Sequence, residues 1–199
     1  MFQSICVFCG SRPGVNSAYV DAARALGRLL AERDVTLIFG GGMTGIMGAL
    51  ADTVLEHGGR AVGVIPERMN VPRVVHENLT ELIVTPNMYS RKVKMFQLSD
   101  AFITLPGGLG TLDELFEALT LSQLGYELKP IGILNVAGYY DPLMDLIDHA
   151  IQAGFIAPRY RDVFTVREEP AMLLEAMAAF EHPLVRDPRS EVGGLRSEV

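Results

Sequence analysis

A chain of 199 residues, of which 49% are hydrophobic and 21% charged, predicts one globular domain with a substantial core. Its net charge of −7 argues against a broad nucleic-acid-binding face, which needs basic side chains, but allows a small anionic ligand at a locally positive site. No apolar run approaches the ~18 residues that span a membrane, and no basic region precedes the first apolar segment, so we expect a cytoplasmic protein without a signal peptide.

Strand-like and helix-like segments alternate along the chain. Short apolar runs predict strands, and apolar residues spaced three and four apart predict helices. We expect strands at about residues 4–9, 35–39, 61–65, 79–85, 101–105, 130–135 and 163–166. We expect helices at about residues 17–33, 87–98, 142–153 and 170–180, and two more that follow glycine-rich turns and end near 57 and 125.

This alternation, with nearly continuous apolar strands, is typical of a parallel sheet covered by helices on both faces. We therefore predict a Rossmann-like, doubly wound α/β domain of six or seven strands over residues 1–181. Residues 67–78 are polar and predict a loop. Residues 182–199 carry prolines, glycines and charges, and they predict a flexible tail. The sequence shows neither an internal repeat nor a second domain.

Three glycine-bearing turns follow predicted strands, at residues 10–14, 40–45 and 106–111. Ligands of parallel sheets bind beyond the carboxyl ends of the strands, so we expect these turns to share one crevice. Residues 40–45 match G-x-G-x-x-G, with Glu67 about twenty residues on, which is a partial dinucleotide-binding fingerprint. Because this turn follows the second strand and Glu67 comes after Pro66, we favour contact with a phosphate or nucleotide over NAD binding. Purely structural turn glycines are the alternative.

The turn at residues 106–111 lies between a buried strand and an amphipathic helix. Free backbone N–H groups and the positive end of the helix dipole converge at such a turn, which favours phosphate binding. Glu114 lies one turn into the helix, where it is a candidate catalytic residue. The spacing Thr111-x-x-Glu114 is also that of a capping box, in which Glu114 would satisfy backbone N–H groups. Arg91 and Lys92, in the preceding helix, can face the same crevice or form a solvated basic surface.

The cysteines and histidines do not predict a metal site or redox chemistry. Cys6 and Cys9 form C-x-x-C, but Cys6 lies inside a predicted strand, and no helix begins beside the pair to stabilise a thiolate. The four histidines are scattered without metal-ligand spacing. We expect neither a metal nor a cofactor.

Residues 106–114 read P-G-G-x-G-T-x-x-E, and with the upstream Arg91-Lys92 pair they closely resemble the LONELY GUY family. The likeness covers about residues 3–165 and includes residues 6–11, 40–42 and 138–140. The family consists of cytokinin riboside 5′-monophosphate phosphoribohydrolases. The resemblance therefore implies hydrolysis of the N-glycosidic bond of a nucleoside 5′-monophosphate to a free base and ribose 5-phosphate. It also implies a homodimer with sites near the interface.

The resemblance identifies Arg91 and Glu114 as the catalytic pair. Nucleotide-binding residues carried over from the motif are Lys92, Gly107, Gly108, Gly110 and Thr111. To the substrate-binding set we add Ser11, Gly42, Met43 and Thr120. The variable position of the motif is Leu109, where the family often has an aromatic residue. A further acidic contact of the family has Glu77 as its candidate here.

Three other functions stay open. The chain can be a nucleotide-binding carrier or sensor without catalysis, or an NAD-dependent oxidoreductase that uses residues 40–45. A decarboxylase is a label sometimes attached to this signature, but pyridoxal phosphate needs a Schiff-base lysine, and the chain holds only Lys92, Lys94 and Lys129. No feature of the sequence specifies the base, which can be a cytokinin, adenine or another base.

Overall fold

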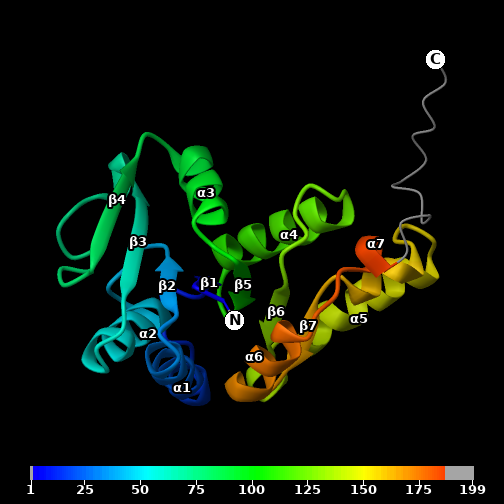
Figure 1. Cartoon of the computed structure of the whole chain (residues 1–199), viewed down its shortest axis with the longest axis horizontal. Coiled ribbons are helices and arrows are strands. Elements are labelled where there is room, and N and C mark those ends of the chain that lie inside the picture. Colours follow the sequence, from blue (N-terminus) through cyan, green and yellow to red (C-terminus); the bar gives the residue numbers. More distant parts are fainter. Residues whose placement is uncertain (1, 187–199) are drawn as a thin grey trace.

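The computed structural model describes residues 2–186 and shows one seven-stranded sheet between two layers of helices (Figure 1). All neighbouring strands pair in parallel, as the sequence predicts. The strands are β1 (Ser4–Phe8), β2 (Thr36–Phe39), β3 (Ala61–Pro66), β4 (Glu81–Thr85), β5 (Ala101–Thr104), β6 (Ile131–Leu134) and β7 (Thr165–Arg167). The helices are α1 (Ala18–Glu32), α2 (Gly45–Glu56), α3 (Met88–Gln97), α4 (Leu109–Gln123), α5 (Asp141–Gln152), α6 (Pro170–Ala178) and α7 (Pro183–Arg186).

The strand order is β4-β3-β2-β1-β5-β6-β7, so the chain builds the sheet outward from β1 in two directions. Strand β1 pairs with β2 through Ile5 and Leu37, and with β5 through Cys6 and Phe102. The direction of winding reverses between β1 and β5. The connections that leave these two strands therefore diverge, and the carboxyl end of the sheet opens into a crevice at this point.

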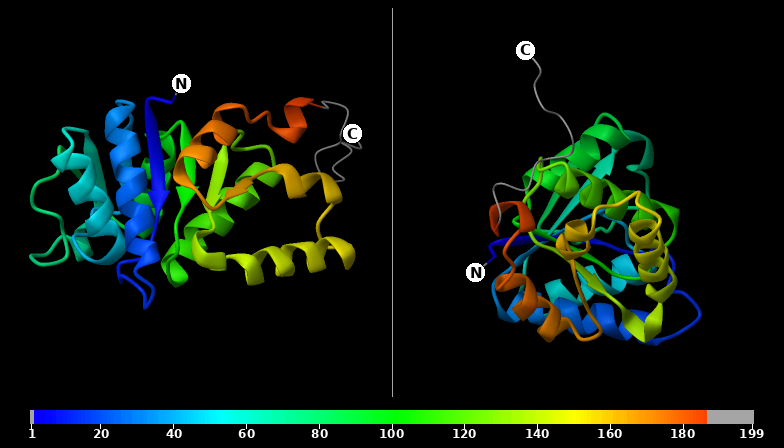
Figure 2. Two further views of the ribbon diagram at one scale, coloured as in Figure 1. Left: turned by 90° about the horizontal axis from the view of Figure 1, so that it is seen from below. Right: turned by 90° about the vertical axis from the view of Figure 1, so that its right-hand side faces the viewer.

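Helices cover both faces of the sheet (Figure 2). Side chains of β1 alternate between these two faces and divide the core in two. Ile5 and Val7 pack with α1, α2 and α6, whereas Cys6 and Phe8 pack with α3, α4 and α5. A strand buried on both faces needs apolar residues at every position, which is why the strands are apolar runs without alternation. The doubly wound α/β prediction is confirmed. Within the described residues, no helix combines the length and the apolar character needed to cross a bilayer.

The polar segment between β3 and β4 is held against the turn after β2. The Met43 N–H donates to the Val74 carbonyl at 3.0 Å, and the His76 N–H donates to the Gly41 carbonyl at 2.9 Å. The buried His76 ring also lies 2.9 Å from the Asp52 carboxylate on α2. This segment is irregular, as predicted, but the contacts fix it along one wall of the crevice.

The predicted tail from residue 182 needs a correction. His182 is only 3% exposed, and its Nε2 lies 2.9 Å from the Ser122 hydroxyl on α4. Its Nδ1 accepts the N–H of Leu184 at 3.2 Å, in the short helix α7. Residues 182–186 are therefore part of the folded domain, because the buried contact between His182 and Ser122 anchors them. The rest of the predicted tail, residues 187–199, lies outside the described residues.

The His182 contact predicts a pH-dependent contribution to stability. Burial lowers the pKa of His182 below its ordinary value of 6.5. The contribution is therefore fully present above about pH 6.5 and is lost as the pH falls toward the lower pKa of the folded state. We expect the melting temperature of the wild type to fall more between pH 7.5 and pH 5 than that of His182→Gln. The exposed His149→Gln is the control, and identical pH dependence in all three proteins would contradict this role.

Candidate active site

The glycine turns after β1 and β5 touch each other at the point where the sheet reverses. The Gly10 N–H donates to the Pro106 carbonyl at 3.1 Å. A Cβ atom built on Gly10 would lie only 3.3 Å from the Gly107 Cα. A larger residue at position 10 would therefore crowd the neighbouring turn, and glycine permits this close approach of the two backbones.

Three adjoining cavities line this crevice, and Ser11 borders all of them. The central cavity, about 280 Å³, is bordered by Arg91 and Glu114. The outer cavity, about 550 Å³, shares Gly108 and other turn residues with the central cavity. The loop-side cavity, about 290 Å³, shares Arg91 with it on the opposite side. The expectation that the three glycine turns share one crevice is confirmed.

The N-terminus of α4 offers unused hydrogen-bond donors to this crevice. The helix begins after Gly108, and no side chain caps it. Among the described residues, no hydrogen bond uses the N–H groups of Leu109, Gly110 and Thr111. These donors, together with the dipole of a 15-residue helix, form an anion site. Gly107 completes the turn, because a Cβ atom there would collide with the Thr111 side chain.

Several backbone donors in and after the turn that follows β2 are already occupied. The N–H groups of Ile46 and Met47, in the first turn of α2, both donate to the Gly10 carbonyl, at 3.0 and 3.2 Å. The Met43 N–H is held by the loop after β3, and the Met43 side chain does not border any of the three cavities. Gly42 borders the loop-side cavity. The G-x-G-x-x-G turn therefore shapes the crevice, and its helix is poorly suited to hold a dinucleotide phosphate.

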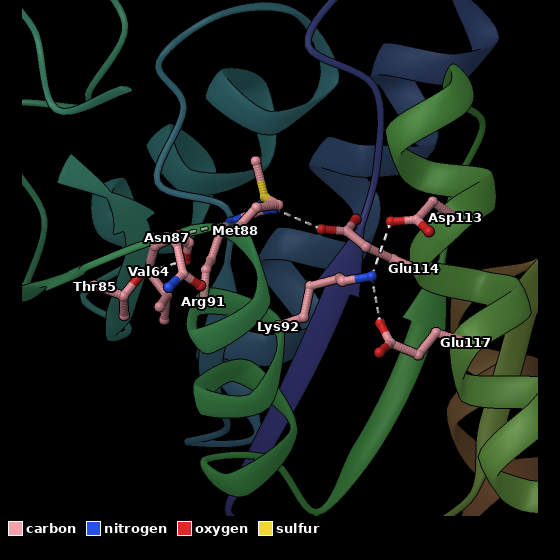
Figure 3. Close-up of polar contacts among 9 residues, drawn as sticks. All are labelled: Val64, Thr85, Asn87, Met88, Arg91, Lys92, Asp113, Glu114 and Glu117. Carbon is pink, nitrogen blue, oxygen red and sulfur yellow. Dashed lines mark hydrogen bonds and ion pairs between the residues drawn. The ribbon is translucent and has the colours of Figure 1, made fainter. Parts of the chain in front are cut away.

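Arg91 of α3 and Glu114 of α4 form an ion pair inside the central cavity (Figure 3). Their Nη1 and Oε1 atoms are 2.9 Å apart, and the side chains are only 14% and 9% exposed. The Arg91 Nε also donates to the Val64 carbonyl at 3.0 Å. The start of α3 is fixed by a reciprocal capping box between Asn87 and Ser90, so Arg91 leaves the first turn of the helix toward the crevice.

The capping-box interpretation of Glu114 is wrong. Helix α4 begins at Leu109, five residues before Glu114, and the carboxylate binds Arg91 instead of the helix N-terminus. Burial raises the pKa of Glu114 above its ordinary value of 4.5, and the charge and hydrogen bond of Arg91 partly offset this effect. A carboxylate with a raised pKa is a better proton acceptor when it ionises, which suits a general base.

Gly40 contributes to the site, although the sequence pointed only to the glycine turn as a whole and not to this residue. A Cβ atom built on Gly40 would collide with the Nη2 of Arg91. The absence of a side chain at the end of β2 therefore leaves the space in which the guanidinium reaches Glu114. A glycine directly after a buried strand can indicate a close approach by another group. Here that group belongs to Arg91, which lies 51 residues further along the chain.

Comparison with known proteins agrees with this site. A family model described as "possible lysine decarboxylase" matches residues 47–177. The cytokinin riboside 5′-monophosphate phosphoribohydrolase LOG of Oryza sativa subsp. japonica is 43% identical, over 100% of this chain and 85% of that protein. LOG3 of Arabidopsis thaliana, which carries the same activity name, is 45% identical over 81% of this chain and 75% of its own length. The chain belongs to the LOG family.

Solved structures share the LOG-type fold at low sequence identity. The molybdenum cofactor carrier protein of Chlamydomonas reinhardtii superposes with a TM-score of 0.67 at 20% identity, over 90% of this chain and 98% of that one. The molybdenum cofactor binding protein of Rippkaea orientalis gives 0.65 at 20% identity, over 90% and 97%. At these identities the likeness shows the fold alone.

Two residues assigned to substrate binding lie away from the crevice of this LOG-family chain. Lys92 binds Asp113 at 3.1 Å and Glu117 at 2.8 Å, so it braces α3 against α4 (Figure 3). The Thr120 hydroxyl donates to the Phe116 carbonyl at 2.7 Å. Thr120 borders a groove between α4 and α5, six residues beyond Glu114.

Other side chains border the crevice without having been singled out from the sequence. Arg12, Tyr19 and Tyr139 line the outer cavity, and Met69 and Arg73 line the loop-side cavity. Arg73 has a φ of 69°, and a non-glycine residue keeps this left-handed conformation only where the surrounding structure imposes it. Except for Tyr19, in the first turn of α1, these residues lie outside the α-helices and strands, where the sequence carries no periodic signal. Glu77 borders a separate surface cavity between β4 and the preceding loop.

The structure disfavours the redox and decarboxylase alternatives. Cys6 and Cys9 lie on opposite faces of the sheet, and burial raises the pKa of both thiols. No lysine borders the three cavities of the crevice in the described part of the chain, so a Schiff-base lysine has no position there. No cluster of three or more His, Cys, Asp or Glu residues suited to a metal ion occurs among residues 2–186.

Gly40→Ala tests whether free space at this position keeps Arg91 on Glu114. A methyl group would push the guanidinium away, and a misplaced catalytic group commonly costs on the order of 10- to 100-fold in rate. We expect that loss in kcat/KM for a nucleoside 5′-monophosphate, the substrate class in the relatives' names. The acid limb of the pH profile should also move to higher pH, because Arg91 lowers the pKa of Glu114.

The control for Gly40→Ala is the same change in an Arg91→Ala background. Without the guanidinium, the added methyl group has nothing to displace, so the double variant should match Arg91→Ala. An equal further loss in the double variant would contradict the proposed coupling between Gly40 and Arg91.

Proposed function

We propose that this chain hydrolyses the N-glycosidic bond of a nucleoside 5′-monophosphate and releases the free base and ribose 5-phosphate. The observation that carries the proposal is the position of a buried Arg91–Glu114 pair beside an unoccupied set of N–H donors at the start of α4. Thr111 and Glu114 are about 5 Å apart along the helix axis, a separation that suits the span of a ribose between its phosphate and its C1′ atom.

In this mechanism the 5′-phosphate accepts hydrogen bonds from the N–H groups of residues 108–111. Gly108, Gly110 and Thr111 bind through their N–H groups, and Gly107 forms the tight turn that presents them. Ser11 faces the same space from the turn after β1. This anchoring uses backbone groups that are already in place, so little ordering is needed when the substrate binds.

Glu114 performs the chemistry at C1′. As the bond from C1′ to the base breaks, its electron pair leaves with the base, and the sugar becomes an oxocarbenium-like cation. The carboxylate stabilises this cation and accepts a proton from the water that attacks C1′. The departing base takes up a proton from solvent and Glu114 returns its proton to solvent, so one water molecule is consumed in total. Arg91 holds Oε1 of Glu114, which leaves Oε2 for the water, and its charge favours the ionised form of the carboxylate against the opposing effect of burial on its pKa.

The base would occupy the loop-side cavity, on the far side of Arg91 from the phosphate site. Its lining is mostly apolar, with Met47, Ile65 and Met69, and Arg73 stands at the same cavity. Gly42 forms part of its wall. The relatives' names specify cytokinin ribosides, so we propose purine monophosphates, either a cytokinin riboside 5′-monophosphate or AMP, as substrates.

Product analysis tests the function. We expect HPLC to show free base from AMP or from isopentenyladenosine 5′-monophosphate, with far slower release from the matching nucleosides, which lack the phosphate. Glu114→Gln keeps the shape but removes the base, so it should lower kcat by about 10²- to 10⁴-fold while melting normally and binding AMP.

Intact AMP after a single-turnover incubation with the wild type would contradict hydrolysis and indicate a nucleotide carrier. Near-normal turnover in Glu114→Gln would remove Glu114 from the chemistry. Equal cleavage of nucleosides and monophosphates would remove the phosphate anchor from the mechanism.

We also propose that the chain forms a homodimer through the outer faces of α3 and α4. Large apolar side chains are exposed there beside the crevice, including Tyr89 at 72%, Leu109 at 86% and Phe116 at 41%. An exposed apolar patch of this kind is typical of a protein interface. Thr120 lies on the same face as Phe116, so its proposed contact with substrate would be made at this interface. Location in the cytoplasm stays a prediction.

Light scattering tests the dimer. The wild type should have twice the chain mass of 21.7 kDa, and Phe116→Glu should shift it toward the monomer, because a buried unpaired charge opposes association. Met172→Glu changes an exposed apolar residue on α6, at the opposite face of the sheet, and should leave the dimer intact. A monomeric wild type, or equal effects of the two variants, would contradict this interface.

A further inference from the structure

The segment after β6 brings Tyr139 against the glycine turn after β5. The Tyr139 hydroxyl donates a 2.6 Å hydrogen bond to the Gly107 carbonyl. Both residues border the outer cavity, beside the N-terminus of α4. Among the described residues, no other side chain forms a hydrogen bond with the backbone of residues 107–110.

Tyr139 stands on a rigid support. It follows a tight turn in which Ala137 has a φ of 50°, a conformation that persists only where the surroundings impose it. The Asn135 side chain fixes this turn, because it donates to Asp141 and accepts the N–H of Tyr140, each at 2.7 Å. Rings of Tyr19 and Tyr140 also pack edge-on against Tyr139, at centroid distances of 5.6 and 4.9 Å.

The peptide that Tyr139 holds lies between two glycines, and among the described residues no backbone N–H donates to its carbonyl. The flanking groups are held, because Gly107 packs against Gly10 and the Gly108 carbonyl accepts the Leu112 N–H at 3.0 Å, but a Cβ atom on Gly108 would meet nothing within 4 Å, which leaves room for the peptide itself to rotate. In a trans peptide the carbonyl of Gly107 and the N–H of Gly108 point in opposite directions. A hydroxyl that holds the carbonyl on the outer side therefore turns the N–H to the other side.

We propose that Tyr139 is a positioning residue for the 5′-phosphate of the substrate. Its hydroxyl keeps the Gly107 carbonyl turned away from the anion and keeps the Gly108 N–H directed at it, in line with the free donors of residues 109–111. Without this bond the peptide between the two glycines can rotate and present a partial negative charge to the phosphate. The proposal relies on the proposed function for the identity of the substrate, but the anion site itself can be tested with inorganic phosphate.

Tyr140 provides a matched control. Its hydroxyl donates a 2.7 Å hydrogen bond to the Leu105 carbonyl, two residues before Gly107. The side chain is 1% exposed and lies in the core, away from the anion site. Tyr139→Phe and Tyr140→Phe therefore each remove one hydroxyl that holds the same segment, but only the first faces the crevice.

The test measures KM and kcat for AMP, cleavage of adenosine, the dissociation constant of inorganic phosphate, and melting temperature. Tyr139→Phe should raise both KM and the phosphate dissociation constant roughly three- to tenfold, as expected for one hydrogen bond. It should leave kcat within about twofold and any cleavage of adenosine unchanged, because adenosine lacks the phosphate. Tyr140→Phe should lower the melting temperature and leave phosphate binding unchanged.

Unchanged phosphate binding in Tyr139→Phe, or an equal loss with AMP and adenosine, would overturn the positioning role. If the wild type cleaves no nucleotide but phosphate binding still depends on Tyr139, the proposed hydrolysis fails and the positioning role stands. If the wild type binds no phosphate, the anion site and the role of Tyr139 are both wrong.

Discussion

The contact between the turns after β1 and β5 is the constraint on which the crevice depends. The strands are neighbours, but the chain winds away from them in opposite directions, so their turns meet where the helices separate. Glycines at positions 10 and 107 allow the backbones of the two turns to pack directly against each other. The Gly10 carbonyl accepts hydrogen bonds from N–H groups in the first turn of α2. The N-terminus of α4 is left unoccupied, and it becomes the place where an anion can bind.

The second requirement is a buried ion pair beside that anion site. A pair such as Arg91 and Glu114 loses hydration on burial, so it is weak support for stability and is better explained by chemistry. Neighbouring groups hold the pair in place. Gly40 leaves space for the guanidinium, and the Val64 carbonyl accepts a hydrogen bond from it. Lys92 forms ion pairs that connect α3 to α4. In the proposed mechanism, the glycine turn and the ion pair together place a phosphate and a carboxylate at the two ends of one ribose.

Local patterns in the sequence predicted the fold, and the family resemblance singled out Arg91 and Glu114, but neither predicted the contacts that position these two residues. Apolar runs and glycine turns are local, so the parallel sheet and its crevice were foreseeable. Arg91 and Lys92 are adjacent, yet successive helical residues point about 100° apart, and only the packing of α3 decides which one faces the crevice. The partners of Gly40, Tyr139 and His182 are 51, 32 and 60 residues away along the chain, and no spacing rule links them.

The central claim is that water attacks C1′ of a bound nucleoside 5′-monophosphate under the control of Glu114. Turnover of AMP in ¹⁸O-labelled water, with immediate borohydride trapping of the sugar, measures this directly. The account predicts one ¹⁸O atom on C1 of the ribose 5-phosphate, none on its phosphate, and about 10²- to 10⁴-fold slower formation of the labelled sugar with Glu114→Gln. Label on inorganic phosphate with release of adenosine, or an unlabelled sugar, would contradict it.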